Sequence, residues 1–148
     1  MAERALPEYL AIVATIDPDA YATGTQLSDA IDMQDHVQAM FIIQLGTIKN
    51  SAATVAFYVM ECATSGGTYT RLSGKSMTAL TGSANNDEQI VINVRADELG
   101  TGMRYLKGSL RVSTDTDAGL LVIGQPRYSD AVTSTSYGDL ASVSEIVV

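Results

Sequence analysis

The sequence has no tryptophan, one cysteine (Cys62), one histidine (His36) and only nine basic residues among 148. A single cysteine excludes an internal disulfide and argues against a disulfide-stapled secreted domain. The sequence holds no run of about 18 apolar residues, so it predicts no transmembrane helix. The N-terminal residues lack the pattern of a signal peptide. We therefore expect the protein in a cytoplasm, or in something assembled there.

The scarcity of basic residues also bears on partners. Seventeen acidic residues against nine basic ones give a net charge of -8, and the lysines and arginines form no cluster along the sequence. Binding to phosphate groups requires clustered basic residues that neutralise them. We therefore expect neither nucleic acid nor a membrane surface as a partner.

Residues that usually carry catalysis are few and have no companions in sequence. His36 lies beside Asp35, but no G-x-S-x-G segment supplies a nucleophilic serine. We therefore interpret His36 as a solvent-facing strand residue. Cys62 follows Glu61 and has no cationic neighbour that would favour a reactive thiolate, which favours a small buried or half-buried residue. The sequence predicts no catalytic residues and no enzyme.

Motifs for metals and nucleotides are also missing. Asp29, Asp32 and Asp35 recur at every third position, and Asp115 and Asp117 form a second acidic pair. Loop carboxylates can bind Ca²⁺, but neither set matches the EF-hand pattern, and aspartates are common in turns. Turn formation is therefore favoured. The glycine-rich spots match neither phosphate-binding pattern. We expect no metal and no cofactor.

What the sequence does contain is a long alternation of apolar and polar residues between His36 and Cys62. Its first half places polar side chains on one face (His36, Gln38 and Gln44) and apolar ones on the other: Val37, Ala39, Phe41, Ile43 and Leu45. A polar break covers residues 46–51. The alternation then resumes at Ala53, Val55, Phe57 and Val59. Two such runs across a short break predict an antiparallel hairpin with one buried face.

Shorter segments predict further strands. They are Tyr9–Ile16, Thr68–Leu72, Gln89–Arg95, Met103–Ser113 and the central, doubly buried Gly119–Gly124. The segment Asp17-Pro18-Asp19 is expected to end the first strand. Residues 27–33 leave two alternatives: a helix at Asp29–Gln38 capped by Ser28, or a short strand at Gln26–Ile31, which we prefer.

Seven or eight strands with almost no helix predict an all-β protein. The favoured architecture is an antiparallel β-sandwich of jelly-roll or Greek-key type. We divide the chain into an N-terminal arm (residues 1–8), a β-sandwich domain (9–138) and a C-terminal tail (139–148). The tail is apolar and alternating, so it either adds a strand to its own sheet or docks on another subunit. Residues expected at an interface between subunits are Glu3, Arg4, Leu6, Leu140, Val143, Ile146 and Val147.

A series of short phrases, taken in order, resembles a family of tailed-phage head decoration proteins, also called capsid cement proteins. The phrases are Asp19–Gln26, Ile31–Gln34, Phe41–Gly46, Ala53–Val55, Gly74–Ser76, Gln89–Arg95, Asp97–Leu99, Met103–Leu106, Arg127–Tyr128 and Asp139–Val147. The resemblance covers the chain from about Asp19 to Val148. Its specificity lies in the order of the phrases, because none of them is a catalytic motif.

The resemblance implies a virion structural protein with a β-sandwich fold. Such proteins sit on the outer capsid surface and bridge neighbouring major capsid protein subunits against the pressure of packaged DNA. They are often homotrimers, and dimeric cement proteins also exist. The resemblance carries over no catalytic residue, and an acidic protein suits an outer surface better than one that faces DNA.

Two other functions stay open at this stage. One is a tail or head-completion component, which would differ from a decoration protein in its number of copies per particle. The other is a receptor-binding or glycan-binding β-sandwich. Glycan sites commonly use aromatic platforms, whereas this sequence has no tryptophan, two phenylalanines and seven tyrosines that are scattered along the chain.

Overall fold

The computed structural model describes residue 6, residues 9–127 and residues 143–144. Within this part the chain forms strands and short 3₁₀ turns, among them η2 (Ser83–Asn85) and η3 (Ala96–Glu98), and no helix is long and apolar enough to cross a membrane. The strands are β1 (Ala11–Tyr21), β2 (Gly24–Leu27), β3 (Ile31–Asp32), β4 (His36–Ile48), β5 (Thr54–Cys62), β6 (Thr70–Ser76), β7 (Leu80–Thr81), β8 (Gln89–Arg95), β9 (Tyr105–Val112) and β10 (Thr116–Pro126).

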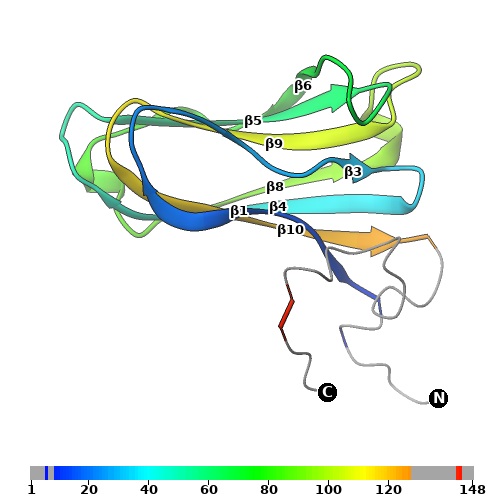
Figure 1. Ribbon diagram of the computed structural model, residues 1–148, viewed down its shortest axis with the longest axis horizontal. Coiled ribbons are helices and arrows are strands. Elements are labelled where there is room, and N and C mark those ends of the chain that lie inside the picture. Colours follow the sequence, from blue (N-terminus) through cyan, green and yellow to red (C-terminus); the bar gives the residue numbers. More distant parts are fainter. Residues whose placement is uncertain (1–5, 7–8, 128–142, 145–148) are drawn as a thin grey trace.

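The strands form two antiparallel sheets that lie one above the other (Figure 1). The first, here called the β4 sheet, has the order β1-β10-β4-β8. The second, the β5 sheet, has the order β2-β9-β5-β6, with β3 beside β9 and β7 beside β5. The predicted all-β sandwich is confirmed, while its assignment to the jelly-roll or Greek-key type stays a prediction.

The predicted hairpin between the two halves of His36–Cys62 is wrong. Both strands exist as β4 and β5, but they belong to opposite sheets. β4 pairs with β10 and β8, and β5 pairs with β9, β6 and β7. The short connection at residues 49–53 carries the chain from one sheet to the other. Alternation identifies the face of a strand that is buried, but it says nothing about the neighbour to which the strand bonds.

The core lies between the sheets and contains both phenylalanines. Phe41 from β4 and Phe57 from β5 are fully buried, with ring centroids 6.0 Å apart and planes tilted by 52°. A tilted pair at this distance adds about 0.5–1.5 kcal/mol to the stabilisation from burial alone. Ala53, Val55 and Val59 point into the same space. The faces predicted to be buried are therefore confirmed, and they meet each other across the sandwich.

The alternation fails at the start of β4. His36, predicted to face solvent, is 3% exposed, whereas Val37, predicted to be buried, is 41% exposed. The pairing with β10 explains both. Pro126 pairs with His36 and Gln125 with Gln38, so Val37 is an extra residue in β4. Such a β-bulge shifts the phase of the alternation by one residue and turns His36 inward.

Two further predictions about β1 to β3 are corrected or decided. β1 does not end at Asp17-Pro18-Asp19 but continues to Tyr21, with a register shift between Ile16 and Asp19. Proline is tolerated there because β1 is an edge strand and the residue sits at a bulge. The helix proposed for Asp29–Gln38 is absent. The chain forms β2 and β3 instead, which is closer to the preferred strand alternative.

Candidate functional site

The residues singled out for catalysis are structural. The Nδ1 atom of His36 lies 2.9 Å from the carbonyl oxygen of Asp32. Because a carbonyl only accepts, Nδ1 carries the proton. Cys62 is buried, as expected, and its Sγ lies so close to Gly67 that a side chain there would collide with it. His36 therefore bonds to the turn before its strand, and Cys62 packs closely against the backbone at Gly67.

The aspartate triplet is used for turn and ion-pair chemistry. No three His, Cys, Asp or Glu side chains in the described part of the chain are arranged to hold a metal ion. The Asp32 carboxylate accepts bonds from the Gln34 amide (3.0 Å) and from the Nε of Arg104 (2.8 Å). Burial alone would raise the pKa of Asp32, but the hydrogen bonds from Arg104 and Gln34 outweigh it and hold the pKa below its usual value. This pair ties β3 to the start of β9.

The outer face of the β5 sheet carries pairs of tyrosines and cations. The guanidinium of Arg71 stacks on the ring of Tyr58 with its Cζ 3.6 Å from the ring centroid, and the Nζ of Lys107 lies 5.0 Å from the centroid of Tyr69. A cation over an aromatic face is attracted by the ring's quadrupole. We name this surface the tyrosine–cation face and define it by Leu27, Tyr58, Met60, Tyr69, Arg71 and Lys107.

Strand pairing explains why these residues meet. Met60 of β5 is paired with Lys107 of β9 on one side and with Arg71 of β6 on the other. The cationic side chains of Lys107 and Arg71 therefore lie on either side of the Met60 thioether. A hollow of about 310 Å³ opens beside them, lined by Leu27, Met60, Ser65, Gly66, Gly67, Tyr69 and Lys107. The surface therefore combines apolar contact area with charged groups at fixed positions.

The loop that walls this hollow is held by Tyr69. Its hydroxyl donates a hydrogen bond of 2.9 Å to the carbonyl oxygen of Ser65, four residues earlier. Burial raises the pKa of Tyr69, and the negative charges that Cys62 and Tyr105 can carry raise it further. Tyr69 therefore stays protonated in neutral solution and keeps its donor role.

The charge of this face is opposite to that of the whole protein. The strands of the β5 sheet contain four basic residues and two acidic ones, Glu61 in β5 and Asp32 in β3, and Asp32 is paired with Arg104. Glu61 is buried, and its Oε2 accepts a bond of 2.8 Å from the Gly100 amide. No ion pair of the described residues involves Arg71, Lys107 or Arg111. These cations are therefore available to an anionic partner on a protein whose net charge is -8.

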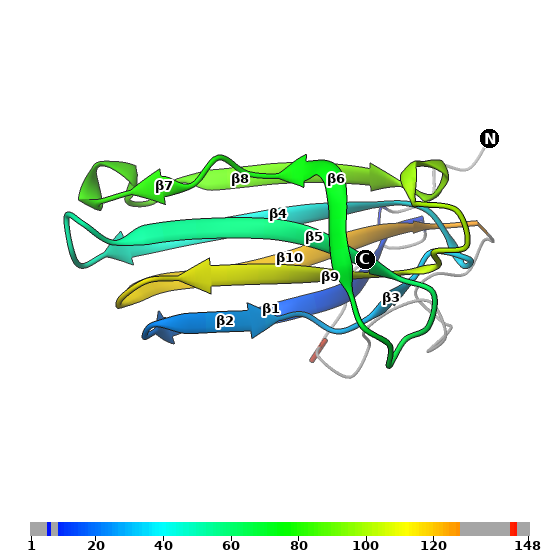
Figure 2. The same cartoon turned by 90° about the horizontal axis from the view of Figure 1, so that it is seen from above.

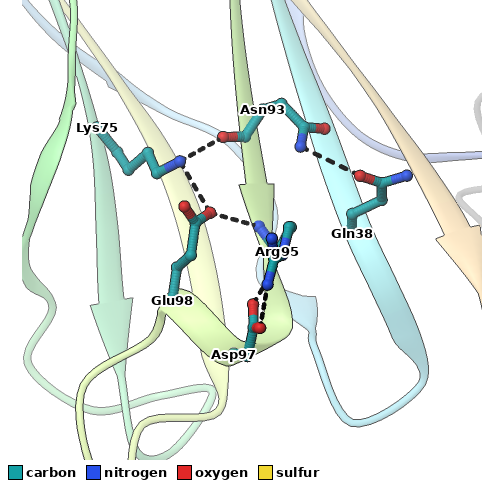
Figure 3. A network of polar contacts seen from close by, with 6 residues as sticks. All are labelled: Gln38, Lys75, Asn93, Arg95, Asp97 and Glu98. Atoms are coloured by element: carbon teal, nitrogen blue, oxygen red, sulfur yellow. Dashed lines mark hydrogen bonds and ion pairs between the residues drawn. The ribbon is translucent and has the colours of Figure 1, made fainter.

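A polar junction closes one edge of the sandwich (Figure 3). Lys75 reaches from β6 to the neighbouring sheet, where its Nζ donates to the carbonyl oxygen of Asn93 and pairs with Glu98, both at 2.8 Å. Glu98 also accepts from the Arg95 amide, and Arg95 pairs with Asp97. In Figure 2, β6 crosses β5 steeply, and its end lies on the side of the sandwich where β8 runs. The junction therefore fastens β6 to an edge strand of the opposite sheet.

Sequence reasoning missed the tyrosine–cation face. The tyrosines looked scattered and the basic residues unclustered because their partners lie far apart in the chain. The sequence did contain one usable signal. Tyr105, Lys107 and Arg111 share the polar side of the Met103–Ser113 alternation, and Tyr58 and Met60 share that of β5. Knowing that β5 and β9 are neighbours would have combined the two sets.

The interface residues predicted at the two ends are mostly untested by the structure. Glu3, Arg4, Leu140, Ile146 and Val147 lie outside the described residues. Of the other two, Leu6 is 69% exposed and Val143 is half-buried. The division into arm, domain and tail likewise stays a prediction.

Comparisons with known proteins complete the description. No protein-family model matches the sequence. No curated protein matches it either. Among solved structures, a chain in a structure of infectious bursal disease virus strain Gt aligns with a TM-score of 0.47 and 7% sequence identity. The alignment covers 81% of this chain and 33% of the viral chain, so this chain spans about a third of that chain's length. At this level of similarity the comparisons assign neither a family nor a function.

Proposed function

We propose that this chain is a virion structural protein that binds the outside of a phage capsid and cements neighbouring major capsid protein subunits against internal DNA pressure. The proposal takes its biological setting from the resemblance to decoration proteins in the sequence. Its proposed locations are the outer capsid surface and, during assembly, the host cytoplasm. The role is mechanical, so it requires neither an enzymatic activity nor a cofactor.

The observation that carries the proposal is the tyrosine–cation face. Tyrosine, arginine and methionine are the residues enriched at the centres of protein–protein interfaces, and tyrosine and arginine supply most of their energetic hot spots. Here Tyr58, Met60 and Arg71 adjoin on a rigid sheet. The cations favour a partner surface rich in carboxylates, and the excess negative charge elsewhere disfavours contact with packaged DNA.

The direct test is binding of the purified protein to DNA-free shells of its major capsid protein. We expect it to sediment with the shells in hundreds of copies, and Arg71→Glu to weaken binding by about tenfold or more because it places a like charge against the partner's carboxylates. Lys49→Glu is the matched control, since it makes the same change of charge at an exposed loop residue away from this face. Equal effects of both variants, or no binding to shells, would refute the proposal.

Two alternative functions predict other results, one for the number of copies per particle and one for binding to glycans. A tail or head-completion component would be present in about a dozen copies per particle, as the symmetry of a connector requires. A glycan-binding protein is the second alternative, and the hollow beside Tyr69 and Lys107 is the feature that favours it. Specific signals on a glycan array that disappear in Tyr69→Ala would support it over the capsid role.

A further inference from the structure

The outer face of the β4 sheet is apolar, although the outer face of a sandwich sheet is normally polar. Strand register places its residues in two adjacent rows. Ile12, Ile123 and Met40 form one row, which ends at Asn93, and Leu121, Ile42 and Val91 form the next, which begins at Thr15. Of the six apolar side chains, five are half-buried, Val91 is 58% exposed, and none belongs to the core or packs against it. We name this surface the apolar face.

The polar residues beside the apolar face are hydrogen-bonded to one another. The Nε2 of Gln38 donates to the Oε1 of Gln125 at 2.8 Å, and the Nδ2 of Asn93 donates to the Oε1 of Gln38 at 3.1 Å. Figure 3 shows the second of these bonds. Gln44 and Gln89 form a further amide row on the other side of the apolar rows. Amides that bond to each other can be covered by a partner without the full cost of leaving polar groups unsatisfied.

The charge on this face restricts what can cover it. The paired residues of these four rows include no Asp or Glu, and the guanidinium of Arg95, at one end, is already paired with Asp97. The nearest carboxylates of the sheet, Asp19 and Asp117, line a hollow at the other end, beside Gln44. A protein with a net charge of -8 repels other copies of itself. The apolar rows, which contain no carboxylate, are therefore a place where two copies can approach closely. They offer little attraction to the acidic partner that suits the tyrosine–cation face.

We infer that the apolar face binds the same face of a second copy of this chain, with the two β4 sheets stacked about a two-fold axis. Stacked sheets lie about 10 Å apart and align well enough for side chains to interdigitate. The four rows span seven residues on four strands. At about 3.3 Å per residue and about 4.8 Å between strands they present roughly 450 Å², more than half of the roughly 800 Å² per partner of a standard interface. This inference goes beyond the proposed capsid role and does not depend on it.

Sedimentation velocity of the purified full chain, without capsid shells, tests the inference. We expect a dimer, and we expect Leu121→Glu to raise its dissociation constant by about a hundredfold because it buries an unpaired charge against an identical one. Val91→Glu is the second variant. It changes an exposed residue of an edge strand, so it tests the interface even where Leu121→Glu impairs folding. Met103→Glu is the control, because this exposed residue lies in a loop outside both sheets.

Several outcomes would overturn the inference. One is a wild-type protein that is monomeric at all concentrations. Another is a dimer whose dissociation constant rises no more in Val91→Glu than in Met103→Glu. A trimer would contradict the two-fold arrangement. A monomer that dimerises only after residues 128–148 are removed would show that this segment covers the apolar face instead. None of these results bears on binding to capsid shells, so the two proposals fail separately.

Discussion

At the scale of single residues, Asp32 joins several parts of the structure through its carboxylate and its carbonyl oxygen. Its carboxylate pairs with Arg104 and accepts the Gln34 amide, while its carbonyl oxygen accepts from His36. One residue thus fixes the turn that leads into β4 and ties it to the strand β9 of the other sheet. A turn beginning at Asp32 was predictable. The pairing of Asp32 with Arg104, 72 residues later in the chain, was not, because that contact depends on how β3 and β9 are joined.

The lowered pKa of Asp32 predicts a pH-dependent contribution to stability. A carboxyl group whose pKa is lower in the folded than in the unfolded state stabilises the fold above its unfolded pKa, here near 3.8, and loses this effect as the pH falls through the folded value. Asp32→Asn should therefore lower the free energy of unfolding by about 1 kcal/mol at neutral pH. The difference from wild type should shrink as the pH falls below 3.8.

Urea unfolding followed by circular dichroism at several pH values measures this effect. Asp29→Asn is the control, because Asp29 is an exposed residue of the same segment for which the structure shows no ion pair. We expect that variant to stay within about 0.5 kcal/mol of wild type. A deficit of Asp32→Asn that is as large at pH 2.5 as at pH 7 would mean that the ion pair is not its cause.

At the scale of elements, the sequence was a good guide to strands and a poor one to their partners. Gln89–Arg95 was predicted with the bounds that β8 has, and the burial of Val55, Phe57 and Val59 in β5 was predicted correctly. Both depend on local alternation, which the sequence contains. The pairing of β4 with β10 joins segments about 80 residues apart, and no local pattern encodes it. The bulge at Val37 could not be predicted either, because it is defined by the pairing of β4 with Gln125 and Pro126 of β10.

The same limit applied to the candidate faces. Each strand of the tyrosine–cation face showed its outward residues in the sequence, but a face exists only after strands are placed side by side. The apolar face was overlooked for a second reason. Gly119–Gly124 was predicted as a strand with apolar residues on both sides, and such a pattern indicates full burial inside one chain. A second copy that covers the outer side would satisfy the pattern equally well.

Two glycines near β7 allow a prediction: Gly74 lies within β6, and Gly82 directly follows β7. Gly74 and Gly82 both have positive φ angles, 75° and 76°. A Cβ on Gly82 would lie 2.6 Å from the backbone oxygen of Ser51, whereas one on Gly74 would meet nothing within 4 Å. Gly74→Ala should therefore cost only the backbone strain, about 1 kcal/mol. Gly82→Ala should cost about 3 kcal/mol or more, because it adds a clash with main-chain atoms that cannot rotate away.

Chemical denaturation of the two variants provides the comparison, with each serving as the control for the other. The backbone strain is common to both, so the difference between their free energies of unfolding isolates the contact with Ser51. Equal losses would show that β7 can move away from the 49–53 connection without cost. They would also show that the bond from the Gly82 amide to the Ala53 carbonyl does not fix its position.

At the scale of the whole molecule, the sandwich has two outer faces of different chemistry. The β4 sheet presents apolar and amide side chains, and the β5 sheet presents tyrosines and cations. The remaining surface carries the excess of acidic residues that gives the protein its net charge of -8. Two separate faces let a protein bind a copy of itself through one and another subunit through the other. This is the arrangement that a cement protein needs in order to bridge neighbours.

The two faces should respond to salt in opposite directions. Salt screens the repulsion between two copies of charge -8, so association through the apolar face should strengthen as sodium chloride rises from about 0.05 to 0.5 M. Binding to capsid shells through Arg71 and Lys107 should weaken over the same range, because salt screens attraction as well. Sedimentation of the free protein and co-sedimentation with shells measure the two effects.

Arg71→Glu should flatten the salt dependence of binding to shells and leave that of self-association unchanged. If both interactions weaken with salt, charge attraction also holds the copies together, and the assignment of the apolar face to self-association is wrong.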